Sequence, residues 1–279
     1  MEQQPFFLTG APKSGTTWLG KLLDAHPEIS CRGEACIHHF GQRLVEAGKS
    51  YNQLLAQRKA AITDANDFPP LPFADVLVLM RTFIELRFQS IADPAKPRLR
   101  LIGEKDPEHA LHFKDLGPLL PGAKFIHILR DGRGVFISAW HHNVRSKYEH
   151  LKTHDFEAFL DITAREWSDR VRRARDGAKL LQDRYFELRY EDLVADPETW
   201  MGRVLGFLGA EADLATVRAC LEAASFEKLS HGRKPGEEDK ASFFRKGDPN
   251  DWRNQLSDAQ SRRFDQLSGG LLRELGYEN

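Results

Sequence analysis

The sequence predicts an α/β protein in which helices cover both faces of a central parallel sheet. Short apolar runs, which suit buried strands, alternate along the chain with longer segments of helical periodicity. The first run, residues 5–9, stops at Gly10 and leads through a glycine-containing loop into a helical pattern. With 279 residues, of which 41% are hydrophobic, the chain is long enough for one sizeable core. We therefore expect a single three-layer domain over residues 1–279.

The expected elements succeed one another in alternating order. After the strand at 5–9 and a helix at 18–25, further strands are expected at 99–103, 124–129 and 185–190. Helical spacing of apolar residues predicts helices at 74–91, 107–120, 132–145, 156–182, 198–208 and 258–275. Within these helices we interpret four large apolar residues as core rather than as a substrate pocket: Phe83, Leu86, Phe88 and Trp167.

Two segments break this regular pattern. Residues 63–72 are rich in Asp and Pro, which indicates a surface loop. Residues 230–250 lack periodicity and contain glycine, proline and many charged residues. A stretch of this length inside a compact domain is typically a functional lid or a disordered segment. We therefore expect a flexible lid at about 230–250.

The composition excludes several classes of protein. Lys plus Arg is 40 and Asp plus Glu is 41, so there is no basic arm for nucleic acid and no acidic tail. Three cysteines, Cys31, Cys36 and Cys220, do not form a disulfide framework or a zinc-binding pattern. The apolar stretches are too short for a membrane span, and the first residues lack the features of a signal peptide. These observations predict a cytoplasmic enzyme, and any anion site must be a local cluster.

The loop after the first strand predicts such an anion site. Residues 10–17 read Gly-Ala-Pro-Lys-Ser-Gly-Thr-Thr where a strand feeds a helix, so backbone N–H groups and the helix dipole favour a bound anion. An ATPase loop would carry lysine directly after Gly15, but Thr16 stands there. The lysine has moved to Lys13, from which it can reach the bridging oxygen of an anhydride. The opening thus predicts a P-loop-like domain that does not follow the ATPase pattern.

Two motifs resemble those of sulfotransferases that use 3′-phosphoadenosine 5′-phosphosulfate (PAPS). Residues 12–18, Pro-Lys-Ser-Gly-Thr-Thr-Trp, resemble the family's 5′-phosphosulfate loop. Residues 130–138, Arg-Asp-Gly-Arg-Gly-Val-Phe-Ile-Ser, resemble the segment whose Arg and Ser bind the 3′-phosphate. The physical chemistry agrees, since a guanidinium grips phosphate as a fork and a hydroxyl adds a donor. The resemblance implies that the donor is held by Lys13, Ser14, Gly15, Thr16, Thr17, Arg130 and Ser138.

A third motif, near the C-terminus, resembles the signature of cytosolic sulfotransferases. Arg-Lys-Gly at 245–247 is followed by Asp-Trp-Arg-Asn at 251–254 and by residues 260–265. In the family, the Arg-Lys-Gly segment closes over the 3′-phosphate, which implies that role for Arg245, Lys246 and Gly247. The segments that begin at Arg189 and Ser225 resemble those that line the adenine, which implies an adenine slot formed by Tyr190, Phe226 and Trp18. The matches run in family order from residue 6 to residue 265.

The N-terminal half is more similar to the tyrosylprotein sulfotransferases and related enzymes. Residues 23–28 with Gly33-Glu34, and Lys105-Asp-Pro107 with residues 121–125, carry this resemblance. It implies that Glu34 is the general base and that Lys105 assists at the sulfuryl group. Cytosolic sulfotransferases of phenols and steroids instead use a histidine two residues after a lysine. Two residues after Lys105, this sequence has Pro107, so that histidine is missing. Their dimer motif is also missing, which leaves the oligomeric state open.

The reaction implied is in-line transfer of a sulfuryl group from PAPS to a hydroxyl or amine, leaving adenosine 3′,5′-bisphosphate. The closest template is phosphoryl transfer, in which positioning and charge stabilisation dominate. Lys13 would stabilise charge on the leaving oxygen, Lys105 the sulfuryl oxygens, and Glu34 would take the acceptor proton. His109 is a second candidate for the base. It shares a helical face with His112, however, and we interpret the two as a pair on the surface rather than as a site.

No metal is expected, because a sulfuryl group carries less charge than a terminal phosphate. The histidine pairs at 38–39 and 141–142 have no ligand at a recognisable spacing. A nucleotide kinase or other P-loop NTPase is the main alternative function, and a nucleotide-binding module without chemistry is the second. Small alcohols or phenols, carbohydrates, lipids and peptidyl tyrosine are all compatible acceptors, and a small molecule, a lipid or a carbohydrate is the one expected of a cytoplasmic chain. Its pocket is expected in loops at 38–55, 67–73 and 141–150.

Overall fold

Five parallel strands form one sheet in the order β2-β3-β1-β4-β5. The computed structural model describes residues 2–61, 68–146 and 155–277. The strands are β1 Gln4–Thr9, β2 Ile29–Gly33, β3 Leu101–Lys105, β4 Lys124–Leu129 and β5 Tyr185–Arg189. Four of them confirm strands expected from the sequence. The edge strand β2 was not expected, because Ser30, Arg32 and Gly33 interrupt its apolar pattern.

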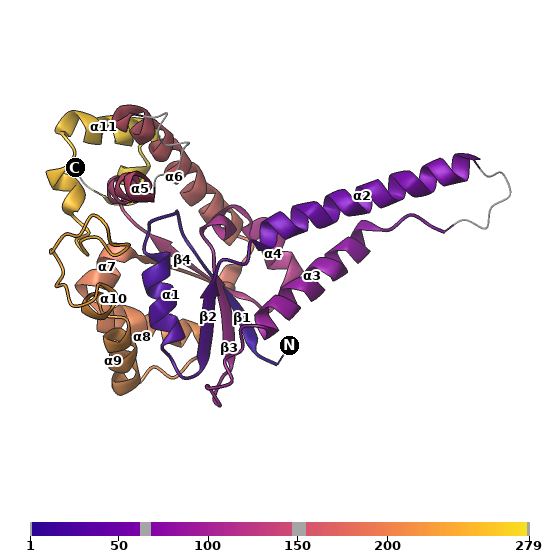
Figure 1. Ribbon diagram of the computed structural model, residues 1–279, viewed down its shortest axis with the longest axis horizontal. Coiled ribbons are helices and arrows are strands. Elements are labelled where there is room, and N and C mark those ends of the chain that lie inside the picture. Colours follow the sequence, from indigo (N-terminus) through magenta and orange to yellow (C-terminus); the bar gives the residue numbers. More distant parts are fainter. Residues whose placement is uncertain (1, 62–67, 147–154, 278–279) are drawn as a thin grey trace.

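Helices cover both faces of the sheet, which confirms the predicted α/β class (Figure 1). Successive strand residues point to opposite faces. Phe6 and Leu8 pack in the core beneath α1, α8 and α9, whereas Phe7 packs in the core beneath α3, α4 and α6. These helices are α1 Thr16–Asp24, α3 Phe73–Gln89, α4 Phe113–Leu119, α6 Phe156–Ala178, α8 Pro197–Leu208 and α9 Leu214–Ala223.

A third core cluster joins the C-terminal helices to the sheet's helical layer. Phe136 of α5, Trp167 of α6, Phe264 of α11 and Leu271 of α12 are buried together. The remaining elements are α5 Gly132–Ser146, α7 Tyr190–Ala195, α10 Phe226–Leu229, α11 Asp258–Leu267, α12 Leu271–Glu274 and the short 3-10 helices η1 Pro107–Leu111, η3 Gln182–Arg184 and η4 Asp251–Asn254.

Two expected helices are each divided in two. The helix expected at 107–120 is η1 followed by α4, because His112 leaves the helical region between them. The helix expected at 258–275 is α11 followed by α12. Gly269 and Gly270 separate them with φ angles of 66° and 72°, in the left-handed region that ends helices. Residues 230–250 contain no helix or strand.

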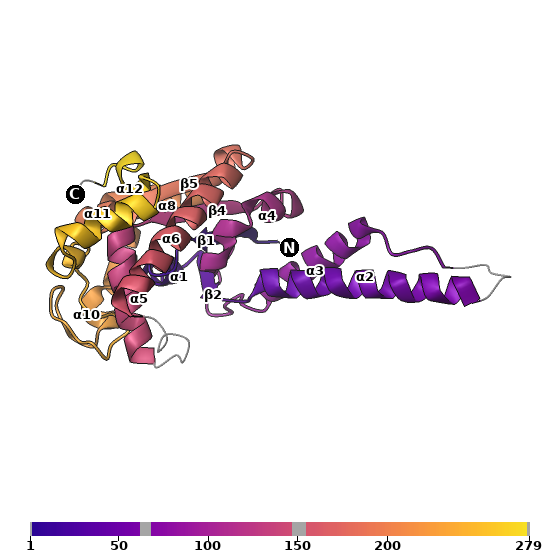
Figure 2. The ribbon, with the colours of Figure 1, turned by 90° about the horizontal axis from the view of Figure 1, so that it is seen from above.

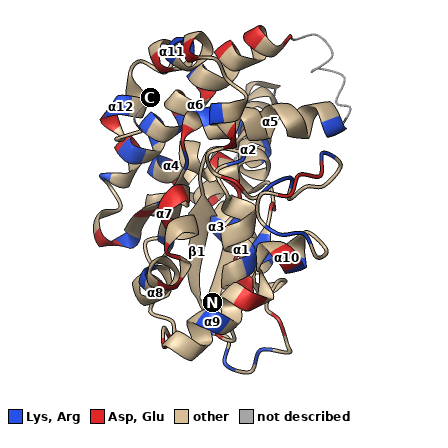
Figure 3. Ribbon diagram, turned by 90° about the vertical axis from the view of Figure 1, so that its left-hand side faces the viewer, with Lys and Arg blue, Asp and Glu red and all other residues tan. Residues whose placement is uncertain are grey.

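A helical arm is the largest departure from the sequence-based expectation. The helix α2 Ile37–Ala61 runs antiparallel to α3, and the pair projects from the body of the molecule (Figures 1 and 2). The expected acceptor loop at 38–55 is therefore wrong, because those residues are helical. Basic and acidic residues are interspersed along the helices (Figure 3). None of the helices in the described ranges is long and apolar enough to cross a membrane.

Candidate active site

The carboxyl ends of all five strands meet at one edge of the sheet, where each strand supplies a residue of the predicted site. The strand β1 leads into the loop 10–15, β2 into Glu34, β4 into Arg130 and β5 into Tyr190, while β3 ends at Lys105. Open parallel sheets bind their ligands at this edge. The topology therefore brings together residues that lie far apart in the sequence.

Two glycines allow the loop after β1 to pass close to its neighbours. A Cβ atom at Gly10 would lie 2.4 Å from the carbonyl oxygen of Ile128, and one at Gly15 would lie 2.6 Å from the Tyr190 ring. Gly15 also has a φ of 98°, which a side chain would strain. The first turn of α1 carries no acidic residue and no side-chain cap. Its backbone N–H groups are therefore available to an anion.

Most of the predicted site residues line one cavity of about 640 Å³ beside this loop. Two do not: Ser14 is buried, with its hydroxyl lacking a hydrogen-bond partner among the described residues, and Lys105 lies behind Glu34. The predicted residues on the cavity wall are Lys13, Gly15, Thr16, Thr17, Trp18, Glu34, Arg130, Ser138, Tyr190, Phe226, Arg245, Lys246 and Gly247.

One end of this cavity is an aromatic slot. The Trp18 indole donates a hydrogen bond to the carbonyl of Ala224 at 3.0 Å and meets the Tyr190 ring edge to face. Phe226 lines the same cavity, and its ring lies against Gly247, where a Cβ atom would come within 2.8 Å of the ring. A flat ring system of the size of a purine suits such a slot.

Arg130 lies between the slot and the loop. One of its nitrogens donates to the carbonyl of Lys13 at 2.9 Å, and the guanidinium lies 4.6 Å from the centre of the Tyr190 ring. Its Nε is buried without a partner among the described residues. Ser138, two turns into α5, faces the same cavity. A guanidinium with a free N–H beside a hydroxyl can hold a phosphate.

The two C-terminal cations, Arg245 and Lys246, share the carboxylate of Asp251. Arg245 pairs with Glu238 and with Asp251, and the Lys246 ammonium lies 2.5 Å from the other oxygen of Asp251. Burial disfavours ionisation of Asp251, but its pairs with Lys246 and Arg245 hold the pKa of its carboxyl below the usual value. Both cations therefore reach the cavity already positioned by a buried anion.

Lys13 lies where the loop after β1 meets the segment 230–250. Its ammonium is 4.5 Å from the centre of the Phe243 ring. Burial, and then the positive charges of Arg145, Arg130 and Lys105, lower its pKa to about 8. The neighbouring positive charges that destabilise the Lys13 ammonium would stabilise a bound anion.

Lys105 and Glu34 form an ion pair beside Lys13. A Cβ at Gly33 would lie 2.7 Å from both the side chain and the carbonyl oxygen of Lys105, so only glycine permits this approach. The pair is asymmetric, because the lysine side chain is 13% exposed and the carboxylate side chain is 49% exposed. Glu34 is thus the partner that faces incoming molecules.

A buried pair behind Glu34 is a feature that the sequence analysis missed. Glu104 on β3 accepts a hydrogen bond from the backbone N–H of Ala35, and its other oxygen lies 2.9 Å from Nε2 of His109. Both side chains are almost fully buried. The carboxylate therefore anchors the backbone directly after Glu34. A glutamate inside an apolar strand was the sequence signal for it.

This pair corrects two expectations about the histidines. His109 is not on the surface with His112: it is buried against Phe7 and lines neither cavity. This placement counts against His109 as the base. Glu104, Asp106 and His109 also have ligand atoms within 4.8 Å of one another, a carboxylate and imidazole grouping that the sequence analysis did not recognise.

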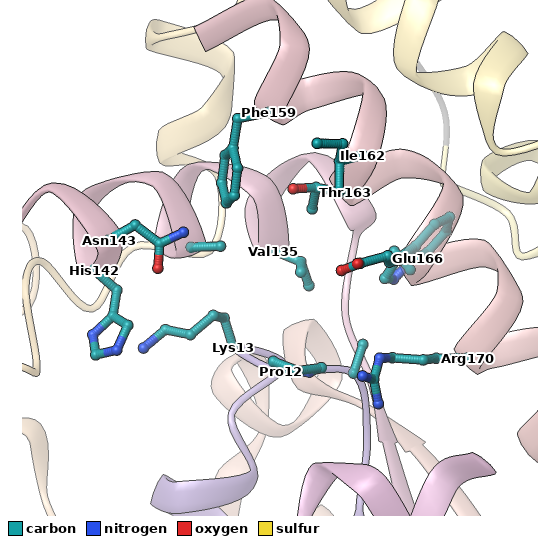
Figure 4. Close-up of a pocket in the computed structure, with 13 residues that line it drawn as sticks. Pro12, Lys13, Val135, His142, Asn143, Phe159, Ile162, Thr163, Glu166 and Arg170 are labelled. Carbon is teal, nitrogen blue, oxygen red and sulfur yellow. The ribbon is translucent and has the colours of Figure 1, made fainter. Parts of the chain in front are cut away.

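A second cavity, of about 310 Å³, lies between α5 and α6 (Figure 4). Val135 and Phe159 form its apolar walls, and Glu166 and Arg170 lie at the end away from Lys13. It shares Pro12, Lys13 and His142 with the first cavity. Trp167, which was interpreted as core, is both buried and part of this cavity's wall.

His142 lies where the two cavities meet. Its Nδ1 is 2.7 Å from a guanidinium nitrogen of Arg145. Burial, and then the charges of Lys13 and Arg145, lower its pKa to about 4. The imidazole is therefore neutral at pH 7. Of the segments expected to form an acceptor pocket, only 141–150 contributes to a cavity wall; residues 67 and 147–150 lie outside the described ranges.

Comparison with known proteins decides the family. A family model described as "Sulfotransferase family" matches residues 5–213. The chain belongs to the sulfotransferase family. This sulfotransferase is similar to the omega-hydroxy-beta-dihydromenaquinone-9 sulfotransferase Stf3 of Mycobacterium bovis, with 28% identity over 246 residues, and to the protein-tyrosine sulfotransferase of Drosophila melanogaster, with 28% identity over 209 residues.

The matched regions cover 74% of this sulfotransferase in both cases, but only 62% and 38% of the two relatives. The chain thus spans less than two thirds of the length of these relatives. Among solved structures, a mouse sulfotransferase SULT7A1 complexed with PAP shares the fold, with a TM-score of 0.61, 20% identity, and coverage of 98% of this chain and 85% of that one. The sulfotransferase domain of the Synechococcus PCC 7002 olefin synthase also shares it, with a TM-score of 0.56, 21% identity, and coverage of 100% and 96%.

Proposed function

We propose that this sulfotransferase moves a sulfuryl group from PAPS to a hydroxyl or amine acceptor by in-line transfer, leaving adenosine 3′,5′-bisphosphate. The observation that carries the proposal is the 640 Å³ cavity, which joins the loop after β1, the Arg130 segment and the Arg245-Lys-Gly247 segment. These three segments are the ones that resemble donor-binding motifs. Because that cavity draws on residues from 12 to 248, we also propose that residues 1–279 act as one domain.

The positions of the predicted motifs along the cavity support one orientation for the donor. The slot between Trp18 and Phe226 suits adenine, and the N-terminus of α1 suits the 5′-phosphate. Arg130, Ser138, Arg245 and Lys246 supply donors for the 3′-phosphate. On binding, the phosphate would compete with Asp251 for Arg245 and Lys246. Part of the binding free energy would therefore compensate for the loss of those ion pairs.

Lys13 stabilises the charge that develops on the leaving oxygen. Its pKa of about 8 means that the ammonium is mostly protonated at pH 7, and a dianionic neighbour raises that pKa further. Lys13 lines both cavities and can therefore act at the point where donor and acceptor meet. Charge placed where the transition state needs it is the main source of catalysis in this type of transfer.

Lys105 and Glu34 complete the machinery. Lys105 lies next to Lys13 closely enough to lower its pKa, so both ammonium groups can bind the sulfuryl oxygens. When Lys105 turns to the sulfuryl group, Glu34 loses its partner and can accept the acceptor's proton. Glu104 holds the backbone N–H of Ala35 and thereby positions Glu34.

The acceptor binds where the two cavities meet. The small size and apolar walls of the cavity between α5 and α6 suit a small, partly apolar molecule better than an extended peptide. The neutral His142 and the side chain of Asn143 can hold its hydroxyl group.

A transfer assay tests the proposal. The protein is incubated with PAPS and a library of alcohols, phenols, sugars, lipids and amines, and the bisphosphate product is quantified. We expect acceptor-dependent product that is lost in Lys13→Ala. Turnover of ATP that depends on Mg²⁺, with none of PAPS, would contradict the proposal in favour of a P-loop phosphotransferase. Tight bisphosphate binding without turnover of any acceptor would favour a binding module.

A further inference from the structure

The imidazole of His142, which lines both cavities, is held in one tautomer by its neighbour on α5. Its Nδ1 lies 2.7 Å from a guanidinium nitrogen of Arg145. A guanidinium carries only N–H donors and keeps its proton, so Nδ1 is the acceptor of this hydrogen bond. Burial, and then the charges of Lys13 and Arg145, hold the pKa of His142 at about 4, so the ring is neutral at pH 7. In a neutral ring whose Nδ1 is an acceptor, the proton lies on Nε2.

Arg145 is itself fixed between α5 and the segment 230–250. One nitrogen of its guanidinium donates to the carbonyl of Ser242 and another to His142, and it makes no ion pair with a carboxylate of the described ranges. The ring of Phe243 lies 4.5 Å from the Lys13 ammonium and meets the His142 ring edge to face, with their centres 6.1 Å apart. The guanidinium thus fastens the imidazole to the segment that lies over Lys13.

The N–H on Nε2 is the part of His142 that this arrangement leaves available. Nε2 has no hydrogen-bond partner in the part of the chain that the structure describes, and it is not enclosed by protein. Figure 4 shows the ring beside the end of the Lys13 side chain, on the wall of the cavity of about 310 Å³. A free donor therefore lies where the sulfuryl donor and the acceptor would meet.

Such a donor discriminates between oxygen and nitrogen nucleophiles. A hydroxyl group has two lone pairs and one proton. Its oxygen can accept a hydrogen bond from Nε2, attack sulfur with the second lone pair and give its proton to Glu34. A neutral primary amine has one lone pair, so it cannot accept from His142 and attack at the same time. An ammonium group has no lone pair.

The charges at this point act in the same direction. After burial, the charge of Arg145 contributes most to lowering the pKa of Lys13. An ammonium group on an acceptor would meet the same repulsion. Glu166 lies at the end of the smaller cavity that is away from Lys13 (Figure 4), and Glu34 is already paired with Lys105. A charged amine is therefore not compensated beside His142.

We propose that His142 donates a hydrogen bond from Nε2 to the acceptor oxygen, that Arg145 is the positioning residue that fixes this tautomer, and that the two make the enzyme prefer hydroxyl over amine acceptors. The new oxygen–sulfur bond forms as the bond between sulfur and the bridging oxygen breaks. The bisphosphate leaves with the electron pair of that bond, and Glu34 receives the acceptor's proton. The imidazole neither gains nor loses a proton. The inference rests on the proposed sulfuryl transfer, but the tautomer is a property of the free protein.

¹⁵N NMR of the histidine rings tests the tautomer without any acceptor. The ring signals that disappear in His142→Gln identify this residue. We expect the proton on Nε2 and a neutral ring between about pH 5 and 8. Arg145→Met should give a mixture of tautomers and a raised pKa of His142, because it removes both the donor to Nδ1 and a neighbouring charge. Arg81→Met, in an exposed pair on α3, is the matched control and should change neither. A proton on Nδ1 in the wild type would overturn the proposal.

Initial rates with PAPS and matched acceptors test the selectivity. The probes are hexanol with hexylamine and phenol with aniline, and aniline, which is neutral at pH 7, separates the lone-pair effect from the charge effect. We expect His142→Leu to lower kcat/KM for the hydroxyl probes about tenfold and to leave the amine probes nearly unchanged. His142→Gln, whose amide keeps an N–H donor, should recover part of the loss. His39→Leu, an exposed histidine outside both cavities, should keep the wild-type ratio.

A pH profile separates positioning by Arg145 from a general structural role. Arg145→Met should lower the ratio of hydroxyl to amine turnover and move the fall of kcat/KM that belongs to Lys13 to higher pH, because a neighbouring charge is lost. Calorimetry with the bisphosphate shows that each variant is folded. Amines that react as well as their hydroxyl counterparts, or a ratio that is the same in His142→Leu, would overturn the proposal. If no alcohol, phenol or amine reacts, the proposed transfer fails instead, and the ring signals still decide the tautomer.

Discussion

The 640 Å³ cavity and the arm formed by α2 and α3 differ in the sequence patterns that build them. The cavity is assembled from short motifs at five strand ends, each with a glycine or a charged residue that chemistry requires. The arm is built from two continuous helices whose apolar residues are required only for packing. Gly15 shows the first case, because a side chain there would collide with Tyr190. Leu86 shows the second, because it was interpreted as core and is 59% exposed.

This contrast teaches that the residues of a motif indicate a binding or catalytic role. Apolar periodicity indicates only that one face of a helix needs to be buried against another surface. Periodicity alone does not say whether the cover is the same chain or another one. Variants in the cavity should therefore change rates and affinities by orders of magnitude, and variants on the arm should leave them intact.

The largest effect is expected from Glu34→Gln. The amide keeps the size and polarity of the side chain but cannot accept a proton, so the rate of transfer should fall about 10²–10⁴-fold. The affinity for the bisphosphate, measured by calorimetry, should be nearly unchanged. Near wild-type turnover in Glu34→Gln would remove the carboxylate from the role of base.

A double-mutant cycle extends this test to the buried pair behind the base. Because Glu104 acts on Glu34 through the Ala35 N–H, Glu104→Gln should slow transfer in the wild type but add little in the Glu34→Gln background. Fully additive losses would show that Glu104 supports the fold in general rather than the position of Glu34.

The second prediction concerns Lys13 and pH. The protonated form carries the charge that stabilises the leaving oxygen, so kcat/KM for the donor should fall as the pH rises through about 8. In the pH profile of kcat, the corresponding fall should occur at higher pH, because the bound anion raises the pKa of Lys13. Lys13→Arg should move the first limb upward, and Lys13→Ala should lower kcat by about 10²–10³-fold. An unchanged limb in Lys13→Arg would assign it to another group.

The third prediction concerns the 3′-phosphate. Arg130→Ala removes a guanidinium whose Nε has no partner in the described chain, and this should cost about 2–5 kcal/mol of bisphosphate binding. A nucleotide that lacks the 3′-phosphate should lose much less. Calorimetry with both ligands separates the two outcomes, and equal losses would place the phosphate elsewhere.

The fourth prediction concerns the segment 230–250. Arg245 and Lys246 lie within it and reach the cavity, so hydrogen exchange of its backbone amides should slow when the bisphosphate is added. The exchange of α4, none of whose residues lines either cavity, serves as the internal reference. Protection that is the same with and without ligand would rule out a lid.

The smallest effect is expected on the arm. Leu86→Glu should change kcat and the bisphosphate affinity by less than about twofold, because Leu86 touches neither cavity. A large loss of turnover in this variant would show that the arm takes part in the reaction, and the contrast between the two regions would no longer hold.

The sequence predicted the fold class, four of the five strands and 13 of the 27 residues on the wall of the 640 Å³ cavity. These features depend on local patterns: an apolar run for each strand, and glycine, lysine or arginine where the backbone turns or a phosphate would bind. The edge strand β2 was missed, because it is short and only its first residues are buried. The buried Glu104–His109 pair was missed as a unit, because its partners belong to β3, η1 and the turn after β2.

By itself, therefore, the sequence determined the donor-binding motifs and their order, since each one is a local arrangement of backbone and charge. The tertiary structure alone decided which of these motifs share a cavity, because parallel strand order brings their ends together. It also decided that Lys13 and His142 join two cavities, and that residues 38–55 form an arm instead of a pocket. Both outcomes depend on contacts between distant segments, which no local pattern records.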